Sequence, residues 1–346
     1  MRSRFNKPIF RILAALTTLI FLTFSLHFLR TSNSNAPDFP CTTDTQSSEV
    51  NVEIASGESG SEIAQSLFKN GVVKSSESFF RVAVGDARAQ KIAPGVHRLS
   101  TKICAWDALS QLLDPSRISG LINITEGAWV SEVIPQLYEA GMSKADVASA
   151  LKSATKPAGF TSLEGLLFPA QYSFEKGTPA KVAIQAMIDR SVKEMKSVGF
   201  FTPGQKFSPQ QLLTIASLLQ AEGNTVDFPK ISQVIRNRLA KGMPLQFDST
   251  VHYVKRSRGS VFLSTESTLI NSPYNSYKHY GLPPGPINNP GSDALKAAVN
   301  PTAGDWLYFI TVAPHDTRYT SDINEFNLWK IEYRKNLKAG KFRSRP

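Results

Sequence analysis

Residues 207–223 have the sequence FSPQQLLTIASLLQAEG, and Glu222 is the only charged residue in this stretch. Ser208 and Gln211 have the spacing of an N-cap and its capping-box partner, and Pro209 suits the first helical position, so a helix is predicted to begin near Pro209. The apolar residues that follow recur at helical spacing: Leu212, Ile215, Leu218 and Leu219. Glu222 lies three and four residues beyond the last two, so it extends the buried stripe and is expected to point inward.

The position of Glu222 also predicts its chemistry. Gly223 ends the helix and leaves Glu222 in the last turn, where the partial negative charge of the free carbonyls opposes an ionised carboxylate. Partial burial raises the pKa of a carboxyl group in the same direction, and a raised pKa is what a general acid near neutral pH needs. Helical geometry alone leaves one alternative open, a frayed helix end with Glu222 in water.

The chain has 346 residues, of which 41% are hydrophobic and 19% charged, a globular composition with room for two domains. The N-terminal residues differ from the rest. Four cations precede Ile12, and residues 12–29 contain no acid, Lys or Arg, a length that spans a bilayer. The basic flank predicts a signal anchor with a cytoplasmic N-terminus and an extracytoplasmic remainder. A cleaved signal peptide is the alternative.

The net charge of +11 leaves the exported part basic after the N-terminal cations are removed, which suits an anionic partner. No nucleic-acid-binding motif accompanies this charge, so a wall polymer or lipid head groups fit better than nucleic acid. Two cysteines occur, Cys41 and Cys104, and both a disulfide and two free thiols are open. No spacing typical of a metal site is present.

The chain divides by composition into four segments. The basic tail and anchor cover residues 1–30, and a polar, turn-rich linker covers 31–49. Residues 50–120 form a small α+β subdomain whose element order fits a LysM-type unit and other small α+β units. Residues 121–346 form a larger domain. The overall class is α+β, with an N-terminal transmembrane helix before the two domains.

A strand-turn-helix unit near residue 52 recurs seventy residues later. The identical pairs are Ile54/Ile124, Gly57/Gly127, Ser61/Ser131, Glu62/Glu132, Leu67/Leu137, Gly71/Gly141 and Lys74/Lys144. Glu62 and Glu132 are explained as acids favoured at helix starts, so neither receives a catalytic role. Between the two units, GVHRLS predicts a strand and AWDALSQLL a helix.

The second half contains the candidate binding groups. Helices are predicted over 180–197, 209–222 and 229–241, whereas periodicity fades after residue 244 until a strand at WLYFITV. Gln246 and Asp248 are expected in a short extended segment, where Asp248 suits either a second catalytic carboxylate or a turn. Tyr274 and Asn275, with nearby tyrosines and prolines, suit a saccharide groove or a braced loop. Glu164 is expected to brace a loop by accepting backbone N–H bonds.

Several distinctive blocks occur in order along residues 50–335: APGVHRLS, LEGLLFPAQY, ASLLQAEG, NRLAKGMPLQFDSTVHY, SPYNSY, GLPPGPINNPG and ALKAAVNP. Their order and spacing closely resemble the endolytic murein transglycosylases, the MltG/YceG-like family. The resemblance implies a membrane anchor, a LysM-like subdomain and a catalytic domain that cuts nascent peptidoglycan glycan strands. The family's catalytic Glu falls on Glu222, which favours the functional interpretation of that residue over a frayed helix end.

The resemblance implies cleavage of the β-1,4 bond between N-acetylmuramic acid and N-acetylglucosamine, with a 1,6-anhydro product, which limits glycan elongation. Saccharide-orienting roles are assigned to five residues: Asn237, Gln246, Asp248, Tyr274 and Asn275. Neither metal nor cofactor is implied. The expected partners are glycan strands and the membrane, with peptidoglycan synthases and division proteins as candidates. A water-using muramidase and a non-catalytic wall-binding protein are the alternative functions.

The sequence departs from the family pattern at three places. Gln220 stands where many relatives have a second acid, which concentrates the catalytic assignment on Glu222. Phe247 and Ser249 replace a small polar residue and a proline, so the groove wall is expected to differ there. The segment RYTSDINEFN lacks a His often found near it, and no function is assigned to residues beyond 310.

Overall fold

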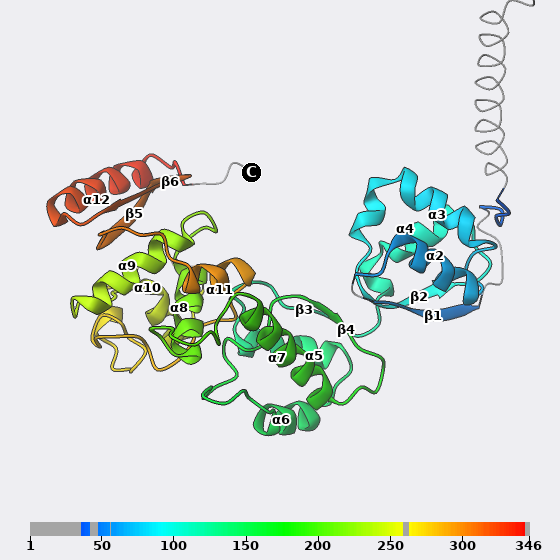
Figure 1. The fold of residues 1–346 in the computed structure, drawn as a ribbon, viewed down its shortest axis with the longest axis horizontal. Coiled ribbons are helices and arrows are strands. Elements are labelled where there is room, and N and C mark those ends of the chain that lie inside the picture. The colour runs from blue at the N-terminus through cyan, green and yellow to red at the C-terminus, as the bar shows by residue number, and fades with distance from the viewer. Residues whose placement is uncertain (1–35, 42–47, 56, 259–262, 343–346) are drawn as a thin grey trace, which may run out of the picture. The chain divides into compact units, whose positions relative to one another are not determined.

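A computed structural model describes residues 36–41, 48–55, 57–258 and 263–342. These residues form two compact units, with the boundary between Ser119 and Gly120 (Figure 1). The predicted membrane anchor over residues 12–29 lies outside the described residues. Within the described part of the chain, no helix has the length and apolar character needed to cross a bilayer.

The first unit is a two-stranded antiparallel sheet packed against helices. Strand β1 (Glu49–Ile54) pairs with β2 (Gly95–Ser100). Between them lie α2 (Gly60–Lys69), α3 (Ser76–Gly85) and the 3-10 helix η2 (Ala87–Lys91), and α4 (Ala105–Leu112) and η3 (Pro115–Arg117) follow. Its core includes Leu67, Phe79, Leu99 and Leu109. The predicted strand at GVHRLS and helix at AWDALSQLL are confirmed.

Residues 36–41 are fastened to this unit. The Ser75 hydroxyl donates to the carbonyl of Pro37 at 2.7 Å, and the Asp38 carboxylate accepts the Ala105 N–H at 3.2 Å. Cys41 and Cys104 form a disulfide, which decides between the two states that the sequence left open. Cys104 is the N-cap of α4 and makes no side-chain capping bond, so Asp38 supplies the acceptor at the start of that helix.

The second unit begins with a short sheet and three helices. Strand β3 (Leu121–Asn123) pairs antiparallel with β4 (Gln171–Ser173). Helices α5 (Val130–Glu139) and α6 (Lys144–Ser153) lie between these strands in sequence, and α7 (Ala180–Ser197) follows them. The later elements are α8 (Pro209–Glu222), α9 (Phe228–Ala240), α10 (Asp248–Lys255), η4 (Ser267–Leu269), α11 (Ser292–Val299), the antiparallel pair β5 (Tyr308–Ala313) and β6 (Asp316–Thr320), and α12 (Ile323–Lys338).

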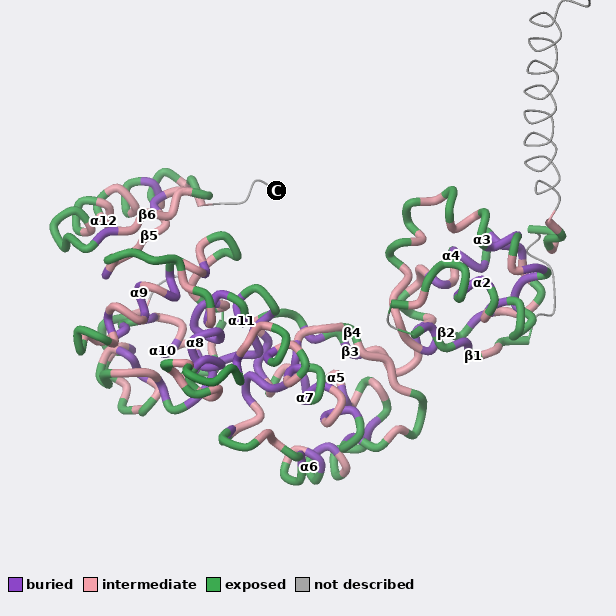
Figure 2. Tube along the Cα trace, in the orientation of Figure 1, coloured by how far each residue is buried: buried purple, intermediate pink, exposed green. Residues whose placement is uncertain are grey.

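Helix α8 lies at the centre of the second unit. Residues 212–219 are all buried, because α9, α10 and α11 pack around this helix (Figure 2). The predicted capping box is confirmed: the Ser208 hydroxyl accepts the Gln211 N–H, and the Gln211 side chain accepts the Ser208 N–H. The predicted extents of α7, α8 and α9 agree with the structure within about one residue at each end.

The repeated strand-turn-helix units have similar local geometry. Glu62 and Glu132 each accept the N–H of the residue that caps their own helix, at 2.7 and 2.8 Å, as expected for helix-start acids. Gly71 and Gly141 follow the ends of α2 and α5 with φ of 69° and 91°, a left-handed conformation that glycine adopts without strain. The seventy-residue repeat is therefore structural.

The region after residue 244 is more regular than the sequence indicated. The prediction that Asp248 lies in an extended segment is wrong, because Asp248 is the first residue of α10. The residues of α10 that face inward, Thr250, Val251 and Tyr253, are β-branched or aromatic, which favours a strand by local propensity. Burial of this short face against α8 overrides that propensity.

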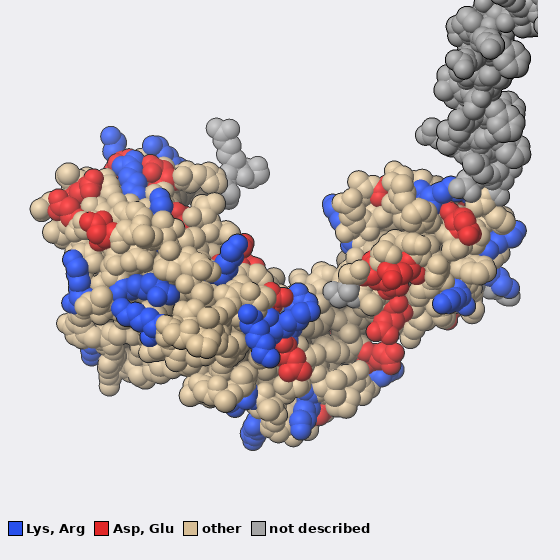
Figure 3. Space-filling model, viewed as in Figure 1, with Lys and Arg blue, Asp and Glu red and all other residues tan. Residues whose placement is uncertain are grey.

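Basic and acidic side chains are interspersed on the second unit. On the face of the described residues shown in Figure 3, Lys and Arg occupy several separate places with Asp and Glu among them. This face has no single continuous basic surface of the kind that tracks a nucleic-acid backbone.

Candidate active site

Glu222 is the last residue of α8 and is partly buried. Its Oε1 accepts the backbone N–H of Ser249, in the first turn of α10, at 3.4 Å. Gly223 follows in an extended conformation, and a Cβ at this position would lie 2.5 Å from Cδ1 of Ile231 in α9. Glycine therefore follows α8 because a side chain at this position would collide with α9. This close approach of the two helices fixes the backbone position of Glu222.

The electrostatic surroundings of Glu222 favour its protonated form. Burial is the largest cause and raises the pKa of Glu222 to about 7, with a further upward contribution from the charge of Asp248. Hydrogen bonding by the side chain and the backbone N–H of Ser249 lowers the pKa, as does the positive charge of Arg238, but these effects do not outweigh burial. Near neutral pH the group can therefore both give and accept a proton.

Asp248 adjoins Ser249 and is held by a tyrosine. The Tyr277 hydroxyl donates to Oδ1 of Asp248 in a short hydrogen bond. The preceding backbone is fastened to the same loop, because the Gln246 N–H donates to the carbonyl of Ser276 at 3.0 Å. Gln246 itself has a left-handed φ of 50°. The turn before α10 thus fixes Asp248 beside Glu222.

Asn237 lies in α9, and the NH₂ group of its side chain is bonded to the backbone. Its Nδ2 donates to the carbonyls of Gly304 and Trp306 at 3.0 and 2.9 Å, and so it holds the segment that leads into β5. Its Oδ1 accepts from Gln233. Both ends of the Asn237 amide are therefore used in hydrogen bonds that stabilise the second unit.

Arg238, the next residue, was not singled out from the sequence. Its guanidinium is buried and donates to the carbonyls of Leu245 and Leu307, both at 2.6 Å. Burial lowers its pKa, and its positive charge is felt at Glu222. The signal was available, since Arg238 continues the stripe of Ile231 and Val234 at helical spacing, as Glu222 does in α8.

Asn275 and Tyr274 lie in the loop that the sequence suggested as a saccharide groove. Asn275 is fully buried; its Nδ2 donates to the carbonyls of Thr268 and Ile270, and its Oδ1 accepts the Tyr277 N–H. Its amide braces this loop. The Tyr274 ring packs at 5.2 Å from that of Tyr253.

Glu164 is buried against the same ring system. It accepts the Val130 N–H at 3.0 Å and the Tyr253 hydroxyl at 3.1 Å. This is the bracing role expected from the sequence.

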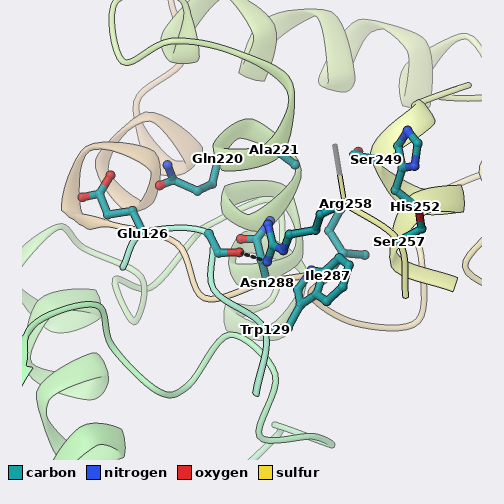
Figure 4. A pocket seen from close by; sticks show the side chains of 11 residues that line it. Glu126, Trp129, Gln220, Ala221, Ser249, His252, Ser257, Arg258, Ile287 and Asn288 are labelled. Atoms are coloured by element: carbon teal, nitrogen blue, oxygen red, sulfur yellow. Dashed lines mark hydrogen bonds between the residues drawn. The ribbon is translucent and has the colours of Figure 1, made fainter. Parts of the chain in front are cut away.

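Two cavities flank the end of α8. The first, of about 360 Å³, is lined by residues that include Trp129, Gln220, Ala221, Ser249, His252 and Asn288 (Figure 4). The second, of about 540 Å³, is lined by residues that include Gln220, Gly223, Asp227 and His315. Glu222 therefore lies in the chain between a residue that lines one cavity and a residue that lines the other.

Among the described residues, one group of potential metal ligands lies close together, formed by Cys41, Cys104 and Asp107 in the first unit. The two sulfur atoms are bonded to each other, so neither is available as a thiolate ligand.

A carboxyl group with a raised pKa, whose neighbours in the chain line two cavities, suits one class of protein: an enzyme that works by proton transfer through an acidic side chain. Comparison with known proteins identifies the family. The model of the YceG-like family matches residues 52–330, and the chain belongs to this family.

Relatives and a solved structure agree with this assignment. The endolytic murein transglycosylase of Bacillus subtilis is 35% identical over 308 residues, which cover 82% of this chain and 84% of that protein. An endolytic murein transglycosylase of Streptococcus pneumoniae is 38% identical over 153 residues, 43% of this chain and 28% of that protein. A crystal structure of a YceG-like protein from Listeria monocytogenes is 28% identical with a TM-score of 0.54, and the match covers 81% of this chain and 98% of that one. The family resemblance inferred from the sequence is confirmed.

Proposed function

We infer that this chain is an endolytic murein transglycosylase, an enzyme that cleaves peptidoglycan glycan strands internally. The family membership and the names of its relatives support the activity. The observation that carries the catalytic assignment is Glu222, whose pKa of about 7 suits a group that is an acid in one step and a base in the next. The proposed products are strands that end in 1,6-anhydro-N-acetylmuramic acid, so that cleavage limits glycan elongation.

In the proposed mechanism one carboxyl group serves both halves of the reaction. Protonated Glu222 gives its proton to the glycosidic oxygen while the bond from C1 to that oxygen breaks, and an oxocarbenium-like state forms at C1. The Glu222 carboxylate then takes the proton of the C6 hydroxyl as O6 bonds to C1. The proton returns to Glu222, and no water is consumed.

The assigned orienting residues divide by their contacts. Gln246, Asp248 and Tyr274 are proposed to orient the saccharide, with Asp248 acting on Glu222 through its charge as well. Asn237 and Asn275 are proposed to contribute indirectly, because their amides hold backbone segments around the site.

The substitution Glu222→Gln tests this function. It keeps the size of the side chain and removes the transferable proton, so turnover on peptidoglycan is expected to fall by roughly 10²- to 10⁴-fold. Mass spectrometry of wild-type products should show anhydro ends, which are about 18 Da lighter than hydrolytic ends because water is not added. Unimpaired cleavage by folded Glu222→Gln would remove Glu222 from the mechanism.

A water-using muramidase is the second candidate, and the position of Asp248 is the observation that favours it. Its charge acts on Glu222, as a second carboxylate would in a hydrolase. The matched variant Asp248→Asn separates the two candidates: a transglycosylase should lose less activity than with Glu222→Gln. Equal losses together with products of full hydrolytic mass would establish the muramidase.

Residues 12–29 are proposed to anchor the chain in the membrane, with residues after Arg30 outside the cytoplasm. Support comes from the apolar run and its basic flank, and the disulfide in the first unit suits an oxidising compartment. A reporter fused after Pro346 should be active only outside the cytoplasm, and cytoplasmic activity would reverse the orientation. Peptidoglycan synthases and division proteins are the proposed protein partners. Crosslinking in cells should capture them, and crosslinked products without any of them would contradict this proposal.

A LysM-like role is proposed for residues 50–120, and a catalytic role for residues 121–346. The order β1, α2, α3, β2, with the two strands paired antiparallel, supports the first assignment. The unit has its own core, so a fragment of residues 36–120 should fold and bind glycan strands weakly. A folded fragment without binding at millimolar saccharide would leave it a structural role only.

A further inference from the structure

The positive charge of the chain is concentrated at its two ends. Residues 1–30 carry five Lys or Arg and no acid, and residues 330–346 carry seven Lys or Arg and one Glu. Residues 31–329 therefore contain 27 basic and 27 acidic residues and have no net charge. The basic character of the proposed extracytoplasmic part thus belongs to its C-terminal segment alone, which begins in the middle of α12.

Helix α12 has one face fixed to the rest of the second unit. It packs on β5 and β6 at the edge of that unit (Figure 1). Asn336 is buried, and its Nδ2 donates to a backbone carbonyl of β5 at 2.8 Å. The Phe326 ring stacks on Tyr308 at 5.1 Å, and Glu332 accepts from Arg318 at 2.8 Å. These contacts set the rotation of α12 about its axis, and so they set the face that it turns to solvent.

The outward face of α12 exposes a pair of apolar side chains. Leu328 is 65% exposed and Ile331 is 62% exposed, and their spacing of three residues makes them neighbours on the helix surface. Apolar side chains that are exposed singly are common and need no explanation. A neighbouring pair on one helix face differs, because another surface can cover both side chains at once and remove them from water.

Three cations continue the outward face toward the end of the helix. Arg334 and Lys335 follow Ile331 by three and four residues, and Lys338 follows it by seven, so all three share its side of α12. All three are exposed, and none forms an ion pair with a residue that the structure describes. The one acid of the C-terminal segment, Glu332, is already paired with an arginine of β6 and does not offset these charges.

The helix dipole alone does not explain this face. Cations in the last turn are favoured by the partial negative charge of the free carbonyls, which accounts for Lys335 and Lys338. It gives no reason for the exposed Leu328 and Ile331 beside them. A soluble phosphate polymer would likewise need the charges only. Apolar side chains next to Lys and Arg on one helix face are typical of helices that lie in the interface of an anionic bilayer.

We propose that the outward face of α12 docks on an anionic phospholipid surface. Leu328 and Ile331 enter the boundary between head groups and acyl chains, and the three cations contact lipid phosphates. The inference rests on the proposed anchoring of the chain by residues 12–29 and adds a second membrane contact to it. The anchor keeps α12 at a high effective concentration near the bilayer, so a shallow contact through two apolar side chains is sufficient.

The test uses the full chain reconstituted in lipid nanodiscs. The two cysteines of the sequence are bonded to each other, so Asn327→Cys supplies a single free thiol on the outward face of α12 for a polarity-sensitive fluorophore. In discs that contain phosphatidylglycerol, the emission should lie at shorter wavelength than in phosphatidylcholine discs. This shift should disappear in about 1 M salt, where charges are screened beyond about 3 Å.

Two variants of the labelled protein separate the two parts of the contact. The triple variant Arg334→Gln, Lys335→Gln, Lys338→Gln keeps good helix formers and removes three charges. Each cation near an anionic surface contributes roughly 5-fold in affinity, so this variant should bind about 100-fold more weakly and lose the shift. The double variant Leu328→Gln, Ile331→Gln keeps the charges and should also lose the shift, because insertion needs the apolar pair.

The matched control is the triple variant Lys181→Gln, Lys193→Gln, Lys196→Gln. It removes three exposed cations from α7, in the same unit, and changes the net charge by the same amount. It should keep the shift of the α12 label. A fluorophore at Val182→Cys, on a residue of α7 that is 53% exposed, should show no difference between the two kinds of disc.

Equal emission from the α12 label in both kinds of disc would overturn the docking proposal, as would a shift that survives in either α12 variant. A comparable shift caused by polyphosphate in phosphatidylcholine discs would replace the lipid surface with a polyanion site. Retention of the chain in phosphatidylcholine discs tests the anchor separately. The α12 variants should cleave soluble glycan strands at the wild-type rate, so the proposed catalytic function stands or falls with Glu222→Gln and the anhydro ends.

Discussion

At the scale of single residues, opposing influences meet at Glu222. Burial and the Asp248 charge favour the protonated carboxyl, whereas hydrogen bonding by Ser249 and the charge of Arg238 favour the ionised one. The balance leaves the pKa of Glu222 at about 7. Near neutral pH the protonated form, which donates a proton, and the ionised form, which accepts one, are therefore both populated. Arg238 donates its hydrogen bonds to two backbone carbonyls. It therefore lowers the pKa of Glu222 through its charge and not through a salt bridge.

The pH dependence of cleavage follows from this balance. Free enzyme must carry the proton on Glu222, so kcat/KM should fall as the pH rises through about 7. Asp248→Asn removes a charge that raises the pKa of Glu222, and the alkaline fall should therefore move to lower pH. Measurement of kcat/KM between about pH 5 and 9 checks both expectations.

Tyr277→Phe is the control for this pH series. It removes the hydroxyl that holds Asp248 but leaves the carboxylate in place. The alkaline fall should therefore stay near its wild-type pH even if kcat decreases. A fall that stays unchanged in Asp248→Asn would show that Asp248 does not set the proton affinity of Glu222.

At the scale of elements, α8 was predictable because its signals are local. The capping box, the apolar spacing and Gly223 define its start, its buried face and its end. Helix α10 was not predictable in this way, because eight residues rich in β-branched side chains carry too little periodicity. Its helical state depends on packing against α8, which is far away in sequence.

The candidate site shows the same division. Glu222 could be found from the stripe of its own helix, whereas the contact of Asn237 with Trp306 joins segments that lie 69 residues apart and that the sequence cannot bring together. Asn288 is the clearest case. It and Asn289 are adjacent, yet both side-chain ends of Asn289 are bonded to backbone, and Asn288 keeps an unpaired acceptor. Only the tertiary structure shows this difference between the two amides.

Gly223→Ala tests how closely α8 and α9 must approach. The added methyl group would meet Ile231 at 2.5 Å, so the helices must separate or Ile231 must move, at a cost of about 1–3 kcal/mol. Because Glu222 precedes this position, kcat should fall along with the midpoint of urea unfolding. Gly85→Ala at the end of α3 is the control, since nothing lies within 4 Å of its added methyl group, and it should leave kcat unchanged without lowering the midpoint of urea unfolding. A Gly223→Ala protein with wild-type stability and kcat would contradict this packing argument.

At the scale of the whole molecule, the chain has two hydrophobic cores that are stabilised in different ways. The second unit holds a large core around α8, whereas the first has a smaller core and a disulfide. Small domains bury a lower fraction of their surface, so a covalent link matters more there. Glu222, the proposed catalytic residue, lies in the second unit, so we expect it to be unaffected by the stability of the first.

Cys41→Ser should therefore act on one unit. Loss of a crosslink between residues 63 apart in sequence lowers the free energy of unfolding by about 2–4 kcal/mol. Hydrogen exchange in the full chain should accelerate in α2, α3 and α4 and stay unchanged in α8. Reductant should reproduce the effect in wild-type protein and add nothing in the variant. Faster exchange in α8 would show that the two units unfold together.

The Cys41–Cys104 bond also decides how the chain carries tension. A pull on the residues before Cys41 crosses the two sulfur atoms to Cys104 and continues toward the second unit, so residues 42–103 bear no load. In the reduced protein the same pull runs through β1, α2, α3 and β2 in series, and their unravelling adds roughly 200 Å of slack. The enzyme is proposed to be anchored in a membrane at one end and to bind a glycan strand at the other. The disulfide therefore limits how far the second unit can move from the membrane under tension, whereas the reduced chain can extend.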